Sequence, residues 1–315
     1  EAEIFSGKTH QIRIHAQACG IPILGDREHG GKEFLRLMLH AQDLELDGGK
    51  IHCPRPRIFD GVKNDEKDLY RFLISLDRRR FLMDHLITDT DVIRLVHREW
   101  TQDKPPKLCV EKLGPYLQIL NYQERDVPRF LIDAMMKEAH CEHFIVRSMA
   151  NRGETGGEGS NVAHSSPHIA STWTAHEHGI RFQFRSTQGL SSGLFLDQRD
   201  NRQFVLTHAH GKRVANFFCY TGGFSVAAAL GGASEVVSVD TSKSAIEWAR
   251  ENFKLNDLVD DRYEFFVADS LFFLKAAQKR HRQFDMILLD PPTFSRGKHG
   301  LFRLHRSHRA RQRFP

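Results

Sequence analysis

The sequence lacks long hydrophobic runs and has few cysteines. No apolar stretch approaches the roughly 20 residues that a membrane-spanning helix needs. The five cysteines (Cys19, Cys53, Cys109, Cys141 and Cys219) are widely spaced and form no C-x-x-C pair. This spacing argues against a disulfide framework and against a zinc knuckle. We therefore expect a soluble, cytoplasmic protein with reduced thiols, no metal and no membrane partner.

Outside its last residues, the chain also lacks an excess of positive charge. The formal net charge is +5 over 315 residues, a pattern that invites a nucleic-acid interpretation. Residues 296–315 contain seven Lys or Arg and no acid, so the remainder has a formal charge of about −2. Net charge is thus weak evidence for RNA. Because this tail has neither strand nor helix periodicity, we expect a truncation or reading-frame change near Gly300.

An initiator Met and a secretory signal are both missing at the N-terminus, so we expect the chain to begin mid-sequence. Ile12 and Ile14 alternate with polar residues, which predicts a strand. His10, Arg13 and His15 then form the polar face of that strand, and a solvated face is favoured over a functional role.

Residues 1–62 nevertheless contain a specific string. SGKTHQIRIH, followed by PILGD and LHA, resembles the C-terminal part of the catalytic domain of pseudouridine synthases that act on large-subunit ribosomal RNA. In that family the catalytic aspartate lies upstream of this stretch. The resemblance therefore implies a β-rich pseudouridine synthase fragment without pseudouridine synthase activity.

Residues 63–87 have helical amphipathicity and predict a helical linker, in which Arg78 to Arg80 form a solvated face. Residues 88–190 predict a small α/β domain with a Gly/Ser-rich loop at 153–167, followed by a hairpin or loop around 189–193. Its order resembles the substrate-side domain of ribosomal RNA methyltransferases. The predicted strands and helix are Val92–Val96, Leu108–Val110, Tyr116–Tyr122, Arg129–Ala139 (the helix) and Phe144–Met149.

The stretch from Val214 to Ser242 predicts the unit that holds an adenosine-containing cofactor. An apolar strand breaks at Thr221-Gly222-Gly223, and a small-residue helix and a second strand ending in Asp240 follow. Asp240 comes 18 residues after Gly222, near the roughly 20-residue spacing at which a carboxylate meets ribose hydroxyls. The stretch has neither G-x-G-x-x-G nor a phosphate-loop Lys, which disfavours dinucleotides and nucleoside triphosphates.

Two further predicted strands also end in acidic residues. Asp269 follows Tyr263–Val267, and Asp290 follows Phe284–Leu289. In an open parallel sheet the carboxyl ends of strands share one crevice, so we expect Asp240, Asp269 and Asp290 to converge. Asp269 can accept a hydrogen bond from an adenine amino group, and the D-P-P-T-F turn can hold a flat base. Between the strands, Ser244 and Glu247 predict the capping box of a helix over 244–255.

Together these motifs resemble the class I S-adenosylmethionine-dependent methyltransferases, most closely the enzymes that methylate bases of large-subunit ribosomal RNA. The resemblance implies a Rossmann-like α/β core over 191–300, C-terminally incomplete because only about four of its strands precede a basic tail at 301–315. It implies that Asp290 is catalytic and that Pro291, Pro292 and Phe294 face the base. The implied cofactor contacts are Gln198, Arg199, Thr221, Gly222, Gly223, Phe224, Asp240, Ser242, Asp269 and Ser270.

The reaction stays open between a guanine nitrogen and carbon 5 of cytosine. Carbon 5 needs a thiolate nucleophile, and Cys219 is favoured as a buried structural residue instead. Two other functions remain: a noncatalytic RNA-binding remnant of two fused RNA-modification enzymes, and a small-molecule oxidoreductase, which the D-P-P-T-F motif disfavours.

Overall fold

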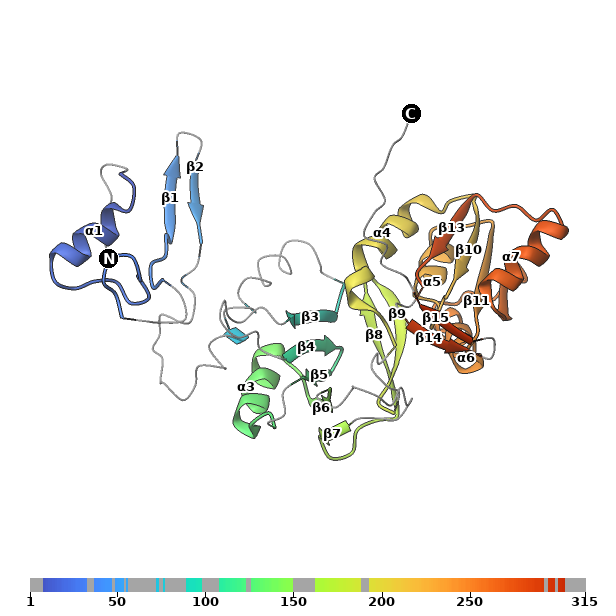
Figure 1. Ribbon diagram of the computed structural model, residues 1–315, viewed down its shortest axis with the longest axis horizontal. Helices are drawn as coiled ribbons and strands as arrows, with labels where there is room; N and C mark the ends of the chain where they lie inside the picture. Colours follow the sequence, from blue (N-terminus) through green and yellow to red (C-terminus); the bar gives the residue numbers. More distant parts are fainter. Residues whose placement is uncertain are drawn as a thin grey trace. The chain divides into compact units, whose positions relative to one another are not determined.

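The computed structural model describes most of the chain (Figure 1). The described residues are 8–32, 37–46, 49–53, 55, 72–73, 76, 89–97, 108–122, 126–149, 162–187, 193–291, 294–297 and 300–303. They divide into two compact units. The first contains Glu1–Thr88, Arg94–Lys112 and Tyr116–Gly153, and the second contains Asp89–Ile93, Leu113–Pro115 and Glu154–Pro315. The predicted linker helix lies almost entirely outside the described residues.

The first element is a helix, so the strand predicted around Ile12 and Ile14 is wrong. Helix α1 spans Gln11–Ala18 and has no buried residue. Its sequence, QIRIHAQA, contains Gln, Arg and Ala, which favour helix, while an isolated strand would need a partner for its backbone. Strands β1 (Asp43–Leu46) and β2 (Gly49–His52) follow as an antiparallel hairpin.

The strands and helix predicted over 92–149 are confirmed, with bounds that differ by at most three residues. A five-stranded sheet has the order β3-β4-β5-β6-β7, and β5 and β6 are parallel. Helix α3 (Arg129–Ala139) connects these two strands, and Pro128 is its N-cap residue. The sheet's strands are β3 (Val92–His97), β4 (Leu108–Leu113), β5 (Tyr116–Asn121), β6 (His143–Ser148) and β7 (Val162–Ser165).

One prediction in the next segment is wrong. Residues 162–165, placed in a loop, form strand β7, while 153–161 lie outside the described residues. The hairpin or loop predicted around 189–193 also lies almost entirely outside them, and a hairpin is formed earlier in the chain by β8 (Thr172–Glu177) and β9 (Ile180–Arg185). His178 and Gly179 connect these strands with φ of 51° and 72°, the left-handed pair that a type I′ turn requires.

The second unit contains a parallel sheet of order β12-β11-β10-β13, with every described pairing parallel. The chain leaves β10 (Arg213–Phe217) through helix α5 (Gly223–Leu230) to β11 (Glu235–Asp240). It then runs through α6 (Lys243–Leu255), β12 (Tyr263–Val267) and α7 (Ser270–Lys279) to β13 (Met286–Leu289). This alternation confirms the predicted Rossmann-like fold, whose elements run from yellow to red in Figure 1.

Small apolar side chains let α5 pack directly against the sheet. Its residues Val226 to Ala228 are fully buried and belong to one hydrophobic cluster with Val214 and Val236. Helix α6 is capped by Ser242, whose Oγ accepts a hydrogen bond from the backbone N–H of Ala245. The predicted cap, Ser244, is therefore wrong by two residues.

The short helix η3 (Leu196–Gln198) and helix α4 (Arg199–His208) precede the core sheet. After β13, strands β14 (Phe294–Gly297) and β15 (Gly300–Arg303) form an antiparallel pair. Every helix among the described residues is too short or too polar to span a bilayer.

Candidate functional site

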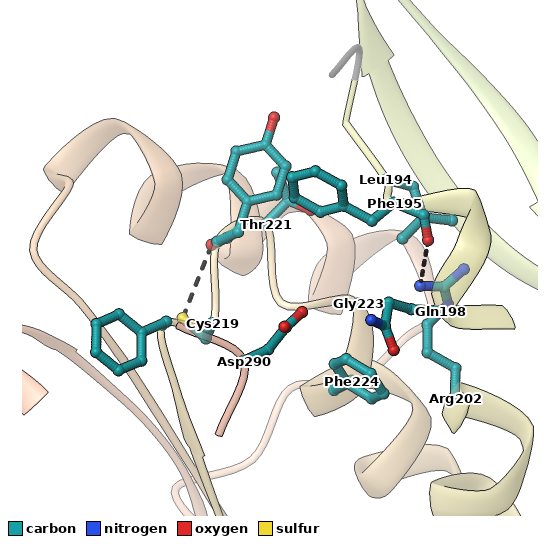
Figure 2. Close-up of a pocket in the computed structure, with 11 residues that line it drawn as sticks. Leu194, Phe195, Gln198, Arg202, Cys219, Thr221, Gly223, Phe224 and Asp290 are labelled. Atoms are coloured by element: carbon teal, nitrogen blue, oxygen red, sulfur yellow. Dashed lines mark hydrogen bonds between the residues drawn. The ribbon is translucent and has the colours of Figure 1, made fainter. Parts of the chain in front are cut away.

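A cleft opens at the carboxyl ends of β10 and β13. Strand β11 lies on one side of β10, and β13 lies on the other. The strand order therefore reverses at β10, which makes this position a topological switch point. Ligands of open α/β sheets bind at this switch point. The cleft is lined by residues from three segments: Leu194, Phe195, Gln198, Arg202, Phe218, Cys219, Tyr220, Thr221, Gly223, Phe224 and Asp290. Figure 2 shows their side chains.

The loop after β10 has an uncommon backbone. Phe218, Tyr220 and Gly222 have φ of 56°, 50° and 76°, so three alternate residues adopt the left-handed conformation. A Cβ on Gly222 would also lie 2.9 Å from Cβ of Ala249, which is too close for a side chain. Glycine is therefore required at 222 for both backbone and packing, and helix α5 can begin immediately at the cleft.

Asp240 fixes this loop from the end of β11. Its Oδ2 accepts a hydrogen bond from the backbone N–H of Tyr220 at 2.9 Å, and its Oδ1 accepts one from that of Ser242 at 2.9 Å. The carboxylate is half-buried. Both oxygens are oriented by backbone donors and keep further acceptor capacity, which suits a pair of ribose hydroxyls.

Buried polar side chains hold the loop and helix α5 in register. Asn252 is fully buried; its Nδ2 donates to the carbonyl of Thr221 and its Oδ1 accepts from the backbone N–H of Gln183. Below the loop, Ser225 of α5 accepts hydrogen bonds from Asn216 and Ser238. These contacts join residues far apart in the sequence, so no local pattern could have identified Asn252.

Asp290 brings a carboxylate to the cleft from the end of β13. The pKa of its carboxyl is raised, first because the cleft wall partly desolvates it and second because Asp197 carries a like charge. In Figure 2 its side chain lies near Gly223 and Gln198. A carboxylate that is weakly stabilised by its surroundings is suited to accept a hydrogen bond or a proton from a ligand.

Cys219 lines the same cleft but its thiol is held neutral. It is 6% exposed, and burial, followed by the negative charge of Asp240, raises the pKa of its thiol well above the ordinary value. Its Sγ donates a weak hydrogen bond to the carbonyl of Tyr220. Thiolates are the reactive form of cysteine, so these surroundings favour the structural role predicted from the sequence.

Arg202 is a cleft residue that the sequence analysis missed. Its guanidinium makes a bidentate ion pair with Glu177 of β8, at 2.7 and 2.8 Å, and also donates to the carbonyl of Phe195 at 2.8 Å. Both side chains are nearly inaccessible, at 3% and 1% exposure. Arg202 thereby fixes the segment that covers the cleft.

Arg199, which the sequence predicted as a supporting cofactor residue, contacts other groups. Its guanidinium donates to the carbonyl of Val92 and lies 3.5 Å from Glu177. It is absent from the described lining of the cleft, whereas its neighbour Gln198 belongs to it. The signal that could have distinguished Arg202 is its position one turn into α4, on the face shared with Gln198.

The structure brings together about a third of the residues predicted to form the site. Gln198, Thr221, Gly223, Phe224 and Asp290 line the cleft. Five more lie at or directly after the carboxyl ends of β10, β11 and β12 without lining the cleft: Gly222, Asp240, Ser242, Asp269 and Ser270.

Asp269 is exposed, and its Oδ1 caps α7 by accepting from the backbone N–H of Phe272. Pro291 follows Asp290 directly, Pro292 lies outside the described residues, and the side chain of Phe294 does as well.

A protein-family comparison decides what kind of site this is. The family model described as S-adenosylmethionine-dependent methyltransferase matches residues 158–315, which is half of the chain. The chain belongs to this methyltransferase family. The match confirms the predicted fold and names the predicted cofactor, S-adenosylmethionine (SAM), and it disfavours the oxidoreductase alternative.

Relatives of the methyltransferase agree with this assignment. The chain is 48% identical over 123 residues to a ribosomal RNA large subunit methyltransferase K/L of Shewanella sp. (strain ANA-3). That match covers 39% of this chain and 17% of the relative, so the chain spans about a sixth of the relative's length.

Solved structures are similar over more of the chain. A protein assigned as a methyltransferase and crystallised with SAH is 26% identical, with a TM-score of 0.63 over 77% of this chain and 62% of that one. The SAM-dependent methyltransferase from Agrobacterium tumefaciens is 28% identical, with a TM-score of 0.51 over 62% of this chain and 61% of that one.

The residues around the cleft fit SAM in three respects. The turn carries no side chain at Gly222 and Gly223, the Asp240 carboxylate is preoriented for hydroxyl groups, and helix α5 begins at the cleft with Gly223 and Phe224.

Proposed function

We propose that this methyltransferase transfers a methyl group from SAM to a base of large-subunit ribosomal RNA. The observation that carries the proposal is the cleft at the switch point, where the glycine turn after β10 and Asp290 after β13 lie together. The substrate class is supported by the relative named as a ribosomal RNA large subunit methyltransferase. It is also supported by the D-P-P-T-F sequence, in which a rigid turn carries an aromatic residue.

SAM, when bound, supplies an electrophilic methyl group on a sulfonium. On the protein side, Asp240 would hold the ribose hydroxyls, and the turn over Thr221 to Phe224 would surround the amino-acid part. Ser242, Asp269 and Ser270 would contact the adenosine end, with Gln198 in a supporting role. Proximity and alignment then account for most of the rate, as expected when two bound reactants need no covalent intermediate.

Asp290 is the proposed catalytic residue. Its ionised carboxylate would accept a hydrogen bond from an N–H of the target base and draw that base toward the cofactor. Pro291, Pro292 and Phe294 would hold the plane of the base. Because the pKa of the Cys219 thiol is raised by burial, a thiolate attack on carbon 6 of cytosine is disfavoured. A guanine nitrogen is therefore the preferred target.

The N-terminal segment and the domain organisation belong to the same proposal. Residues 1–62 would derive from a pseudouridine synthase, followed by a linker at 63–87, a substrate-side domain at 88–190, the methyltransferase core at 191–300 and a basic tail at 301–315. This segment would be inactive toward uridine by itself. Conversion of uridine to pseudouridine by the chain in ribosomal RNA would contradict that statement.

The test is methyl transfer from labelled SAM to large ribosomal subunits that lack their natural methylation. The proposal predicts label in one nucleotide of the large-subunit RNA, identified by nuclease digestion and mass spectrometry, and none in small-subunit RNA. If the chain binds SAM and RNA but transfers no label to either subunit, it is a noncatalytic RNA-binding remnant and the proposal fails.

A further inference from the structure

Three possible metal ligands lie together near the start of the chain, in a unit that the methyltransferase site does not use. Nδ1 of His10 is 3.3 Å from Nε2 of His29 and 3.7 Å from a carboxylate oxygen of Glu28. One ligand atom from each of the three residues lies within 4.8 Å of the other two. His10 and Glu28 are exposed and His29 is half-buried, so an ion could reach them from solvent.

The spacing matches the edges of a metal-coordination tetrahedron. Zinc–nitrogen bonds of about 2.0–2.1 Å at tetrahedral angles separate two ligand nitrogens by about 3.3 Å. The observed distance between the two ring nitrogens is 3.3 Å. A carboxylate oxygen at 3.7 Å needs only a small rotation to reach the same separation. Without an ion, the same two rings can share one hydrogen bond, in which one nitrogen donates and the other accepts.

A buried ion pair holds two of these ligands in place. Asp26 is 1% exposed, and both of its oxygens accept hydrogen bonds from Arg13, at 2.8 and 2.6 Å. Asp26 also accepts from the backbone N–H of His29 at 3.2 Å, and Arg13 donates to Glu28 at 2.7 Å. Metal ligands in proteins are typically oriented by such outer hydrogen bonds.

The third ligand is oriented by its backbone. His10 precedes α1 in the left-handed conformation, with φ of 57°. Its ring meets that of His29 edge to face, with centroids 5.4 Å apart. The two rings thus approach through their nitrogens and do not stack. Sequence spacing gave no sign of this group, because His10 and Glu28 are 18 residues apart and no Cys or His repeat connects them.

We propose that His10, Glu28 and His29 bind one divalent transition-metal ion of the zinc class, with water at the fourth position. Two imidazoles and one carboxylate suit Zn²⁺, Ni²⁺ or Cu²⁺ and do not suit Mg²⁺ or Ca²⁺, which prefer oxygen ligands. The ion would join the start of α1 to the turn after Asp26. This site is independent of the proposed methyl transfer.

The test is a titration of Zn²⁺ against a chromogenic chelator, with the full chain and three variants. His29→Ala and His10→Asn remove one ligand each, and asparagine tolerates the left-handed backbone at position 10. His15→Ala is the matched control, because His15 is an exposed histidine of α1, the helix that follows His10. Cysteines elsewhere could also bind Zn²⁺, so the measured quantity is the difference between each variant and the wild type.

The proposal predicts that His29→Ala and His10→Asn each lose one equivalent of Zn²⁺ or bind it at least tenfold more weakly, while His15→Ala binds as the wild type does. It further predicts that Mg²⁺ does not compete, because Mg²⁺ prefers oxygen ligands. Equal Zn²⁺ stoichiometry and affinity in the wild type, His29→Ala and His10→Asn would overturn it, as would an absence of binding by the wild type.

Discussion

At the scale of single residues, Asp290 and Cys219 lie in one cleft but differ in how readily their side chains ionise. Both groups have a raised pKa, which means that each keeps its proton to higher pH than usual. The ordinary pKa of a carboxyl group, 3.8, is far below that of a thiol, 9.0, so Asp290 is the more readily ionised of the two. The cleft therefore offers a hydrogen-bond acceptor and no thiolate nucleophile.

Replacing Asp290 by Asn should remove methyl transfer while leaving SAM binding intact. The amide keeps the size of the side chain but accepts hydrogen bonds weakly, and loss of a proton-accepting group typically lowers kcat by about 10²–10⁴-fold. SAM affinity measured by calorimetry should stay within about twofold, because Asp290 faces the base in this account. Asp261→Asn, an exposed aspartate before β12, is the control. Activity of Asp290→Asn close to that of the wild type would contradict the assigned role.

The pH dependence of the wild type follows from the same pKa shift. The working form is the ionised carboxylate, so kcat should fall as the pH drops through the pKa of Asp290, which lies above 3.8 because of desolvation and Asp197. In Asp197→Asn the like charge is gone, and the acidic limb of the rate profile should move to lower pH. An unchanged limb in this variant would show that another group controls it.

Replacing Cys219 by Ala should leave methyl transfer within about threefold of the wild type, because a buried neutral thiol takes no part in a transfer to nitrogen. The assay is the same transfer to large-subunit RNA. Loss of transfer with SAM binding retained, together with a trapped covalent RNA adduct in the wild type, would instead identify carbon-5 chemistry.

At the scale of secondary-structure elements, the parts of the site formed by consecutive residues could be predicted from the sequence, and the parts formed by distant contacts could not. The unit β10-α5-β11 was predictable because its apolar strands, glycine turn and terminal Asp240 are consecutive in the sequence. Helix α1 was mispredicted because Ile12 and Ile14 alternate by chance in a segment that buries nothing. Arg202 and Asn252 were missed because their partners Glu177, Gln183 and Thr221 are 25 to 69 residues away.

The ion pair between β8 and α4 should be important for stability. Glu177→Ala would leave the Arg202 guanidinium buried without its carboxylate, which typically costs about 3–5 kcal/mol. The free energy of unfolding from urea denaturation measures this cost. Asp257→Asn is the control, because its pair with Arg181 is exposed, and such pairs contribute about 0–1 kcal/mol. If Glu177→Ala were as stable as Asp257→Asn, the pair would not secure the segment over the cleft.

The ion pair that connects the start of β10 to the residue before β13 should stabilise the fold less at acid pH. Arg213 donates to Asp285 from both its backbone and its guanidinium, which lowers the pKa of Asp285 from 3.8 to about 2. A depressed folded-state pKa contributes stability that is present above pH 3.8 and is lost as the pH falls toward 2. Between these values the wild type should lose more stability than Asp285→Asn in circular dichroism experiments. Parallel curves would contradict this contribution.

At the scale of the whole molecule, the family assignment rests on residues 158–315, and the residues before 158 lie outside the family match. Composition and net charge contributed little to the prediction of function, because the excess of positive charge is concentrated in the last 20 residues. The order of motifs contributed most, since three strands followed by acidic residues define one edge of a parallel sheet. The proposed metal group, in the other unit, depends on a turn that no periodicity indicates.

The most direct measurement is calorimetric titration of the full chain with SAM and, separately, with NAD. The account predicts one SAM site, no binding of NAD, and at least a tenfold loss of SAM affinity in Asp240→Ala, whose carboxylate would otherwise hold the ribose hydroxyls. Binding of NAD in preference to SAM, or equal SAM affinity in the wild type and Asp240→Ala, would contradict the account of the cleft after β10 as the methyl-donor site.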